Sequence, residues 1–193
     1  SPRVWQQANT TMLSNIKPFT KKSDSPVSWK DETIANADNG DMTVRCYKAG
    51  GKKSGFRRKR IHNPDETVML FFHGGGFCIG DVDTHHEFCH AVCEQTGWSV
   101  VSVDYRLAPE CPAPAALKDC ITAYAWLVEN SDKLGALPSR IVLAGDSAGG
   151  GLSTLIAQQL TAPSKSAWAD LGLDGQKMFN LLEKLPEPLA QMP

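Results

Sequence analysis

Charge and long apolar runs are both scarce in this 193-residue chain. The formal net charge is only −1, so no overall electrostatic field favours nucleic acid or an acidic membrane surface as a partner. No apolar run approaches the roughly 20 residues that a membrane-spanning helix needs, and no secretory signal pattern is present. With 41% apolar and 21% charged residues, the composition is typical of one globular domain or part of one.

A disulfide framework is also missing. The six cysteines follow no spacing typical of a disulfide-rich domain, and a chain of this size does not need one. We therefore expect reduced thiols and a cytoplasmic location. The residues are Cys46, Cys78, Cys89, Cys93, Cys111 and Cys120.

Histidine is confined to the first half of the chain. No histidine follows His90, so the C-terminal half contains no imidazole that could act as a general base there. The five histidines are His62, His73, His85, His86 and His90.

Two glycine-rich motifs are present, and each directly follows an apolar segment. The second, Gly145–Gly150, fits the G-x-S-x-G nucleophile elbow, in which Ser147 stands on a strained turn between a strand and a helix. The first, His73–Gly76, fits a loop whose backbone N–H groups stabilise an oxyanion. The pattern predicts Ser147 as nucleophile, with the N–H groups of Gly74, Gly75 and Ala148 as oxyanion donors.

Strands and helices are expected to alternate along the chain. Continuous apolar strands that alternate with helices predict a three-layer α/β fold with a mostly parallel sheet. In such sheets ligands bind beyond the carboxyl ends of the strands, where both glycine motifs lie. The expected strands are 42–47, 67–72, 98–103 and 140–144, and the expected helices are 84–96, 114–130 and 149–160.

Several motifs together resemble one known family. The segments His73–Phe77, Gly80-Asp81, Thr84-His85, Val103–Glu110 and Gly145–Gly150 are similar, in order and spacing, to the hormone-sensitive-lipase-like family of α/β-hydrolases. The resemblance implies esterase or lipase activity on a small ester or lipid substrate, without a cofactor. It also implies supporting roles near the site for His73, Gly76, Asp104, Tyr105 and Asp146.

The chain departs from that family after the elbow helix. The family order is serine, then an acid, then histidine, but only Asp170 and Asp174 are later aspartates and no histidine accompanies them. We expect a cap-like segment at 1–38, the first half of the hydrolase domain at 39–162, and at 163–193 an atypical tail that replaces the acid- and base-bearing half and has no strand like those that carry these residues. The sheet would then be incomplete, ending beside the elbow strand with an exposed edge that a dimer or a complementing chain covers.

Three explanations of this departure stay open. The chain is a truncated product, it lacks internal segments, or residues 174–193 begin a second unit similar to the amphipathic cap segment that opens members of this family.

Other patterns have simpler interpretations. His86 with His90, or Cys89 with Cys93, has the spacing of zinc ligands on a helix, but a helix with partly buried cysteines is the preferred interpretation and no metal is predicted. The basic cluster 52–60 is interpreted as a solvated loop. His73 is expected to shape its loop rather than act as a base.

Two classes of function remain. The first is a serine carboxylic ester hydrolase that acts through an acyl-enzyme on Ser147 and is inactive where the base is lacking. The alternative is a non-catalytic relative, either a small-molecule receptor of the same fold, as in plant gibberellin receptors, or an inactive remnant.

Overall fold

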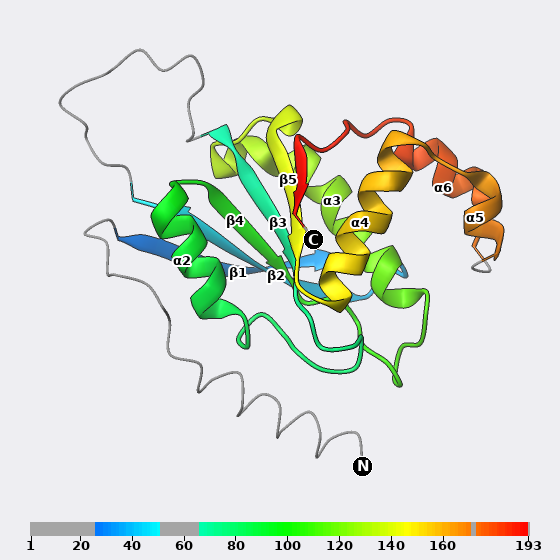
Figure 1. Cartoon of the computed structure of the whole chain (residues 1–193), viewed down its shortest axis with the longest axis horizontal. Helices are drawn as coiled ribbons and strands as arrows, with labels where there is room; N and C mark the ends of the chain where they lie inside the picture. The colour runs from blue at the N-terminus through cyan, green and yellow to red at the C-terminus, as the bar shows by residue number, and fades with distance from the viewer. Residues whose placement is uncertain (1–25, 51–65, 171–172, 193) are drawn as a thin grey trace.

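A computed structural model describes residues 26–50, 66–170 and 173–192. Its centre is a six-stranded sheet in the order β1-β2-β4-β3-β5-β6 (Figure 1). Strand β2 runs antiparallel to both β1 and β4, whereas β4, β3, β5 and β6 run parallel to one another. The strands are β1 (Val27–Ala35), β2 (Asp41–Ala49), β3 (Val68–Phe72), β4 (Ser99–Val103), β5 (Ile141–Gly145) and β6 (Ala190–Met192).

Helices cover both faces of the sheet. One face carries α2, which contacts β4 and β2, while α4 packs over β5 and β3 with α3 beside it (Figure 1). Among the described residues no helix is long and apolar enough to cross a membrane. The helices are α2 (His86–Thr96), α3 (Ala115–Asn130), α4 (Ala148–Thr161), α5 (Lys165–Asp170) and α6 (Gly175–Leu182), with 3₁₀ turns η2 (Ser131–Leu134) and η3 (Pro138–Arg140).

Alternation along β3 divides the core into two layers. Leu70 and Phe72 join the cluster that includes α3 and α4, whereas Met69 and Phe71 join Cys89 and other residues on the α2 side. All five residues of β3 are buried, because a central parallel strand is covered on both faces. Each fully buried side chain of this size contributes about 1.5–3 kcal/mol, so the strands that carry the two glycine motifs are firmly held.

Strand β1 is an element that the sequence analysis did not predict. It pairs with β2 through an antiparallel hairpin whose turn contains Asn39-Gly40, with Asn39 at φ 64°. Asparagine followed by glycine is the strongest short-range hairpin signal because both tolerate a positive φ. That dipeptide was therefore the signal available in the sequence.

The tail after α4 corrects one prediction. It contains a short strand, β6, which pairs in parallel with β5. The sheet consequently does not end beside the elbow strand, as was expected. Trp168 and Leu182 bury their side chains in the core beside α3 and α4, and Tyr124 donates a hydrogen bond to the Pro186 carbonyl at 2.7 Å.

Two predicted features lie outside the described residues. The basic cluster 52–60 falls within 51–65, and most of the cap-like segment 1–38 falls within 1–25. Their interpretations stay predictions, as do the domain boundaries.

The first residues of α4 lie against the end of β3. A Cβ atom on Gly149 would lie 1.9 Å from the Phe72 carbonyl oxygen, whereas a Cβ on Gly151 in the same helix would meet nothing within 4 Å.

We expect Gly149→Ala to lower the free energy of unfolding by about 3 kcal/mol or more, because overpacking against backbone cannot relax. Gly151→Ala is the matched control and should be neutral or stabilising by up to about 1 kcal/mol, since alanine favours helix. Urea unfolding followed by circular dichroism measures both. Equal stability of the two variants would contradict the close contact between Gly149 and the Phe72 carbonyl.

Candidate active site

Three loops meet at the carboxyl ends of the parallel strands. The glycine loop follows β3, residues 104–114 follow β4, and the elbow follows β5 (Figure 1). This is the edge of an open α/β sheet at which ligands bind.

Ser147 stands on a strained backbone turn. Its φ of 51° and ψ of −113° fall where an L-residue rarely lies, at a cost of order 1–3 kcal/mol. The residue is exposed and directly precedes the first residue of α4, Ala148. A Cβ on Gly145 would lie 2.3 Å from the Gly149 carbonyl carbon, which shows how closely the turn folds on itself. The helix N-terminus adds a positive end beside the hydroxyl.

The glycine loop bends sharply after His73. Gly75 has φ 126°, and its carbonyl accepts hydrogen bonds from the N–H groups of Cys78 and Ile79, both at 3.1 Å. Gly76 follows with φ 61° and is exposed. The loop therefore turns its backbone outward at the sheet edge.

One predicted oxyanion donor needs correction. The Gly74 N–H donates to Asp146 Oδ1 at 2.7 Å, so that donor is already engaged within the protein. Among the described residues, the N–H groups of Gly75, Gly76 and Ala148 make no hydrogen bond. Gly76, placed among the supporting residues from sequence, therefore has the unengaged N–H that Gly74 lacks.

His73 is enclosed beneath the loop that it begins. Its ring is fully buried and stacks on Tyr105 at a centroid distance of 4.2 Å. Nδ1 donates to the Gly74 carbonyl at 2.8 Å, and the Tyr105 hydroxyl donates to the His73 carbonyl at 2.5 Å. Burial lowers the pKa of His73, which keeps the ring neutral. These contacts connect the loops after β3 and β4.

Asp104 lies at the end of β4 close to other acidic groups. Burial, together with the carboxylates of Asp81 and Asp83, raises the pKa of Asp104 to about 6. Its N–H donates to the Thr43 carbonyl at 3.0 Å, which fixes its backbone against β2.

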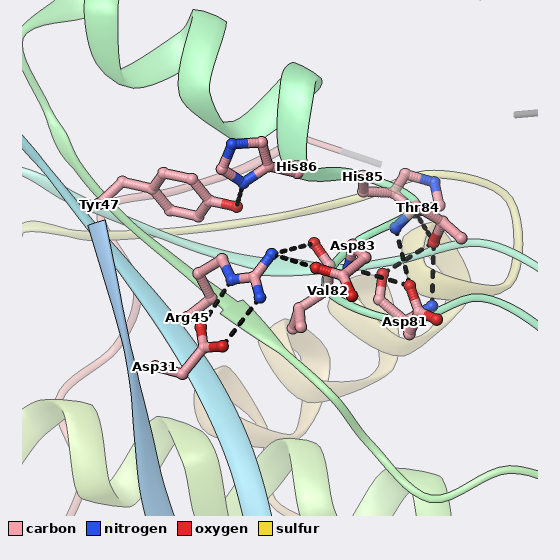
Figure 2. Close-up of polar contacts among 9 residues, drawn as sticks. All are labelled: Asp31, Arg45, Tyr47, Asp81, Val82, Asp83, Thr84, His85 and His86. Atoms are coloured by element: carbon pink, nitrogen blue, oxygen red, sulfur yellow. Dashed lines mark hydrogen bonds and ion pairs between the residues drawn. The ribbon is translucent and has the colours of Figure 1, made fainter. Parts of the chain in front are cut away.

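A buried arginine that the sequence analysis did not single out holds the segment that follows the glycine loop. Arg45 on β2 pairs with Asp31 on β1 through Nε at 2.6 Å and with Asp83 through NH1 at 2.6 Å (Figure 2). The guanidinium also lies 4.5 Å from the centroid of the Trp29 ring. A buried charge needs such partners, but the pairing joins three separate segments and left no short-range signal in the sequence.

An apolar cavity of about 400 Å³ opens beside the glycine loop. Its wall includes Gly76 and Phe77 of that loop and Leu152 and Leu155 of α4. Arg106 also lines it, but its charge is balanced by Asp119 and by Asp38, both at 2.8 Å. The cavity is therefore suited to an uncharged apolar group.

The residues with zinc-like spacing lie on α2 and take other contacts. Cys89 and Cys93 are fully buried in the core under α2, and His86 Nδ1 lies 3.0 Å from the Tyr47 hydroxyl. Within ranges 26–50, 66–170 and 173–192, no group of three or more histidine, cysteine, aspartate or glutamate side chains could hold a metal ion.

Among the described residues, neither a general base nor a triad acid is found at Ser147. In the part of the chain that the structure describes, the Ser147 hydroxyl makes no hydrogen bond with a histidine. His85 Nε2 lies instead 3.3 Å from Asp146 Oδ1, and His62 lies outside the described ranges. The site thus holds a candidate nucleophile and candidate donors without the group that would activate the hydroxyl.

Comparison with known proteins gives this arrangement its family. The model of an alpha/beta hydrolase fold family matches residues 69–181. Lipase 2 of Moraxella sp. (strain TA144) is 56% identical over 200 residues, covering 100% of this chain and 43% of that protein. Hormone-sensitive lipase of Ictidomys tridecemlineatus is 41% identical over 96 residues, covering 50% of this chain and 13% of that protein.

A solved structure shows the same architecture. The structure of an arylesterase superposes with a TM-score of 0.70 at 25% identity, covering 99% of this chain and 51% of that one. The chain thus spans about half, or less, of each of these three proteins. Because the matched family model covers more than half of the chain and includes both glycine motifs, the chain belongs to the hormone-sensitive-lipase-like family of α/β-hydrolases.

Proposed function

We propose that this chain carries the nucleophile and oxyanion donors of a serine carboxylic ester hydrolase of the esterase or lipase type. The observation that carries the proposal is the strained, exposed Ser147 directly before α4, beside a glycine loop with unengaged N–H groups. Relatives named as lipases and esterases support it.

The reaction would proceed by acyl transfer. Ser147 Oγ attacks the ester carbonyl carbon while a base takes the hydroxyl proton, and the carbonyl oxygen becomes an oxyanion. We assign its stabilisation to the N–H groups of Gly75, Gly76 and Ala148, because each donor that is preorganised there contributes about 100- to 1,000-fold in rate. The C–O bond then breaks, the alcohol leaves with the proton, and water releases the acid from Ser147.

The acid and the histidine base are proposed to come from outside the described residues. A complementing polypeptide, or a second copy of the chain, would pair with the outer edge of β6, the last strand of the described sheet. Leu189 and Met192 support this because about half of each side chain is exposed beside that edge. The six cysteines, none in a disulfide, favour a cytoplasmic location.

The apolar part of the ester is proposed to occupy the cavity beside Gly76. Its volume of about 400 Å³ and its leucine and alanine walls suit an aliphatic chain. Leu152 and Leu155, which line the cavity, lie on α4 one to two turns after Ser147. This supports a substrate position between the cavity and the Ser147 hydroxyl.

A receptor-like function is the second candidate. The observation that favours it is the lack of a base at Ser147 among the described residues. A binding protein would use the apolar cavity without needing acyl transfer.

We expect a fluorophosphonate to modify Ser147 faster than any other serine, because only that hydroxyl stands beside preorganised donors. Mass spectrometry of the adduct locates the label, and Ser147→Ala should not react at that peptide. Circular dichroism of both proteins controls for folding. A folded chain that stays unlabelled both alone and in the presence of the complementing polypeptide would contradict the hydrolase and favour the receptor.

Filling the cavity should change chain-length preference. Ala116→Phe should slow labelling by a hexyl fluorophosphonate relative to a methyl one by roughly 10-fold or more, because a pocket discriminates aliphatic chains by size. Ala125→Phe, on the same helix α3 but outside the cavity wall, is the matched control. An unchanged hexyl-to-methyl rate ratio in Ala116→Phe would show that the cavity does not bind the aliphatic chain of the substrate.

A further inference from the structure

We propose that His85 is a positioning residue for the site, holding the Asp146 carboxylate so that the glycine loop and the nucleophile elbow stay in register. This inference rests on the proposed function for its effect on the reaction, but the contact that it assigns can be tested without activity.

Asp146 is the link between the two motifs. Its Oδ1 accepts the Gly74 N–H at 2.7 Å, joining segments 72 residues apart in the sequence. A Cβ on Gly74 would lie 2.1 Å from Asp146 Oδ2, so the carboxylate lies directly on the loop backbone. The next residue after Asp146 is Ser147, and the next two after Gly74 carry unengaged N–H groups. Movement of this carboxylate would therefore shift the N–H donors of the loop relative to the Ser147 hydroxyl.

The Asp146 side chain needs a second contact to stay in place. About half of it is exposed (53%), so alone it would exchange its loop contact for water. His85 Nε2 lies 3.3 Å from the same Oδ1. Burial opposes ionisation of Asp146, but the hydrogen bonds from His85 and Gly74 outweigh it and lower the pKa of Asp146.

His85 is itself held on every side. Its side chain is 12% exposed, with the ring 5.7 Å from that of Phe71 and 5.8 Å from that of His73. Nδ1 lies 3.0 Å from Thr84 Oγ1 and accepts from that hydroxyl in the tautomer that carries its proton on Nε2, which leaves the Nε2–H to donate to Asp146. The ring therefore presents Nε2 to Asp146 with little freedom to turn.

The segment that carries His85 is anchored to the sheet. Asp81 Oδ1 accepts the N–H groups of Asp83 and Thr84 at 2.9 and 2.7 Å. Asp83 in turn pairs with Arg45, whose side chain is only 7% exposed, and Arg45 is held by Asp31 (Figure 2). Short polar contacts thus connect the β1–β2 hairpin, through the segment that carries His85, to Asp146. An isolated ion pair on the surface would lack this support and would stabilise little.

His86 provides a built-in comparison. It is adjacent in sequence, but its Nδ1 lies 3.0 Å from the Tyr47 hydroxyl, whereas the His85 ring lies beside Thr84 (Figure 2). The His86 ring also lies against Trp29. His86→Gln should therefore leave the Asp146 contact intact.

The experiment compares two substitutions of His85. His85→Phe keeps a ring against Phe71 and His73 but removes the donor, whereas His85→Gln keeps an N–H near the position of Nε2. We expect His85→Phe to slow fluorophosphonate labelling of Ser147 about 100-fold, the size of effect that a misplacement of about 1 Å produces. His85→Gln should recover most of the rate, and His86→Gln should match the parent chain.

A second readout is independent of chemistry at Ser147. Amide hydrogen exchange of Gly74, followed by NMR, should accelerate in His85→Phe and stay slow in His85→Gln and His86→Gln. If the parent chain is not labelled even with the complementing polypeptide present, the proposed function fails, while Gly74 exchange still decides the role of His85.

A double-mutant cycle keeps the proposal testable if His85→Phe does not fold. Asp146→Ala, at a half-exposed side chain, should release Gly74 and slow labelling by a similar factor. His85→Leu, which removes both the ring and the donor, should by itself slow labelling, but when added to Asp146→Ala it should have no further effect, because the two side chains act through one contact. Unchanged Gly74 exchange and labelling in folded His85→Phe, or strictly additive effects in the cycle, would overturn the proposal.

Discussion

Close contact between the elbow and the end of β3 is the constraint on which the site depends. The first turn of α4 lies so near the Phe72 carbonyl that only glycine fits at position 149. This contact fixes where Ser147 stands relative to the glycine loop, because the loop leaves β3 one residue later. Two strands buried on both faces support the contact from below, so the strain at Ser147 is held by packing rather than by local preference.

Polar contacts then refine what the packing sets. His73 and Tyr105 join the loops after β3 and β4 by stacking and by hydrogen bonds to backbone carbonyls. Asp146 joins the loop after β3 to the elbow. The arrangement uses one predicted donor, Gly74, as a structural link, and this leaves the two following glycines with N–H groups that face no partner among the described residues.

The chemistry of this site is unevenly distributed. The candidate nucleophile, the candidate donors and an apolar cavity lie together, whereas no histidine is found bonded to Ser147 among the described residues. The glycine loop follows β3 and the elbow follows β5, so both candidate groups come from neighbouring parallel strands. Histidines that are present serve other contacts, as His73 and His85 illustrate.

The sequence by itself predicted the strands that carry the motifs and marked Ser147 as the candidate nucleophile, because apolar continuity and glycine spacing are local signals. It missed β1 although Asn39-Gly40 marked the turn, and it missed β6 because three residues give too short a pattern. Only the tertiary structure decided that Gly74 donates to Asp146, and that Arg45, Asp83 and His85 support the loop. Those contacts join segments far apart in the chain, and which partner a polar group takes depends on folded geometry rather than on neighbours in sequence.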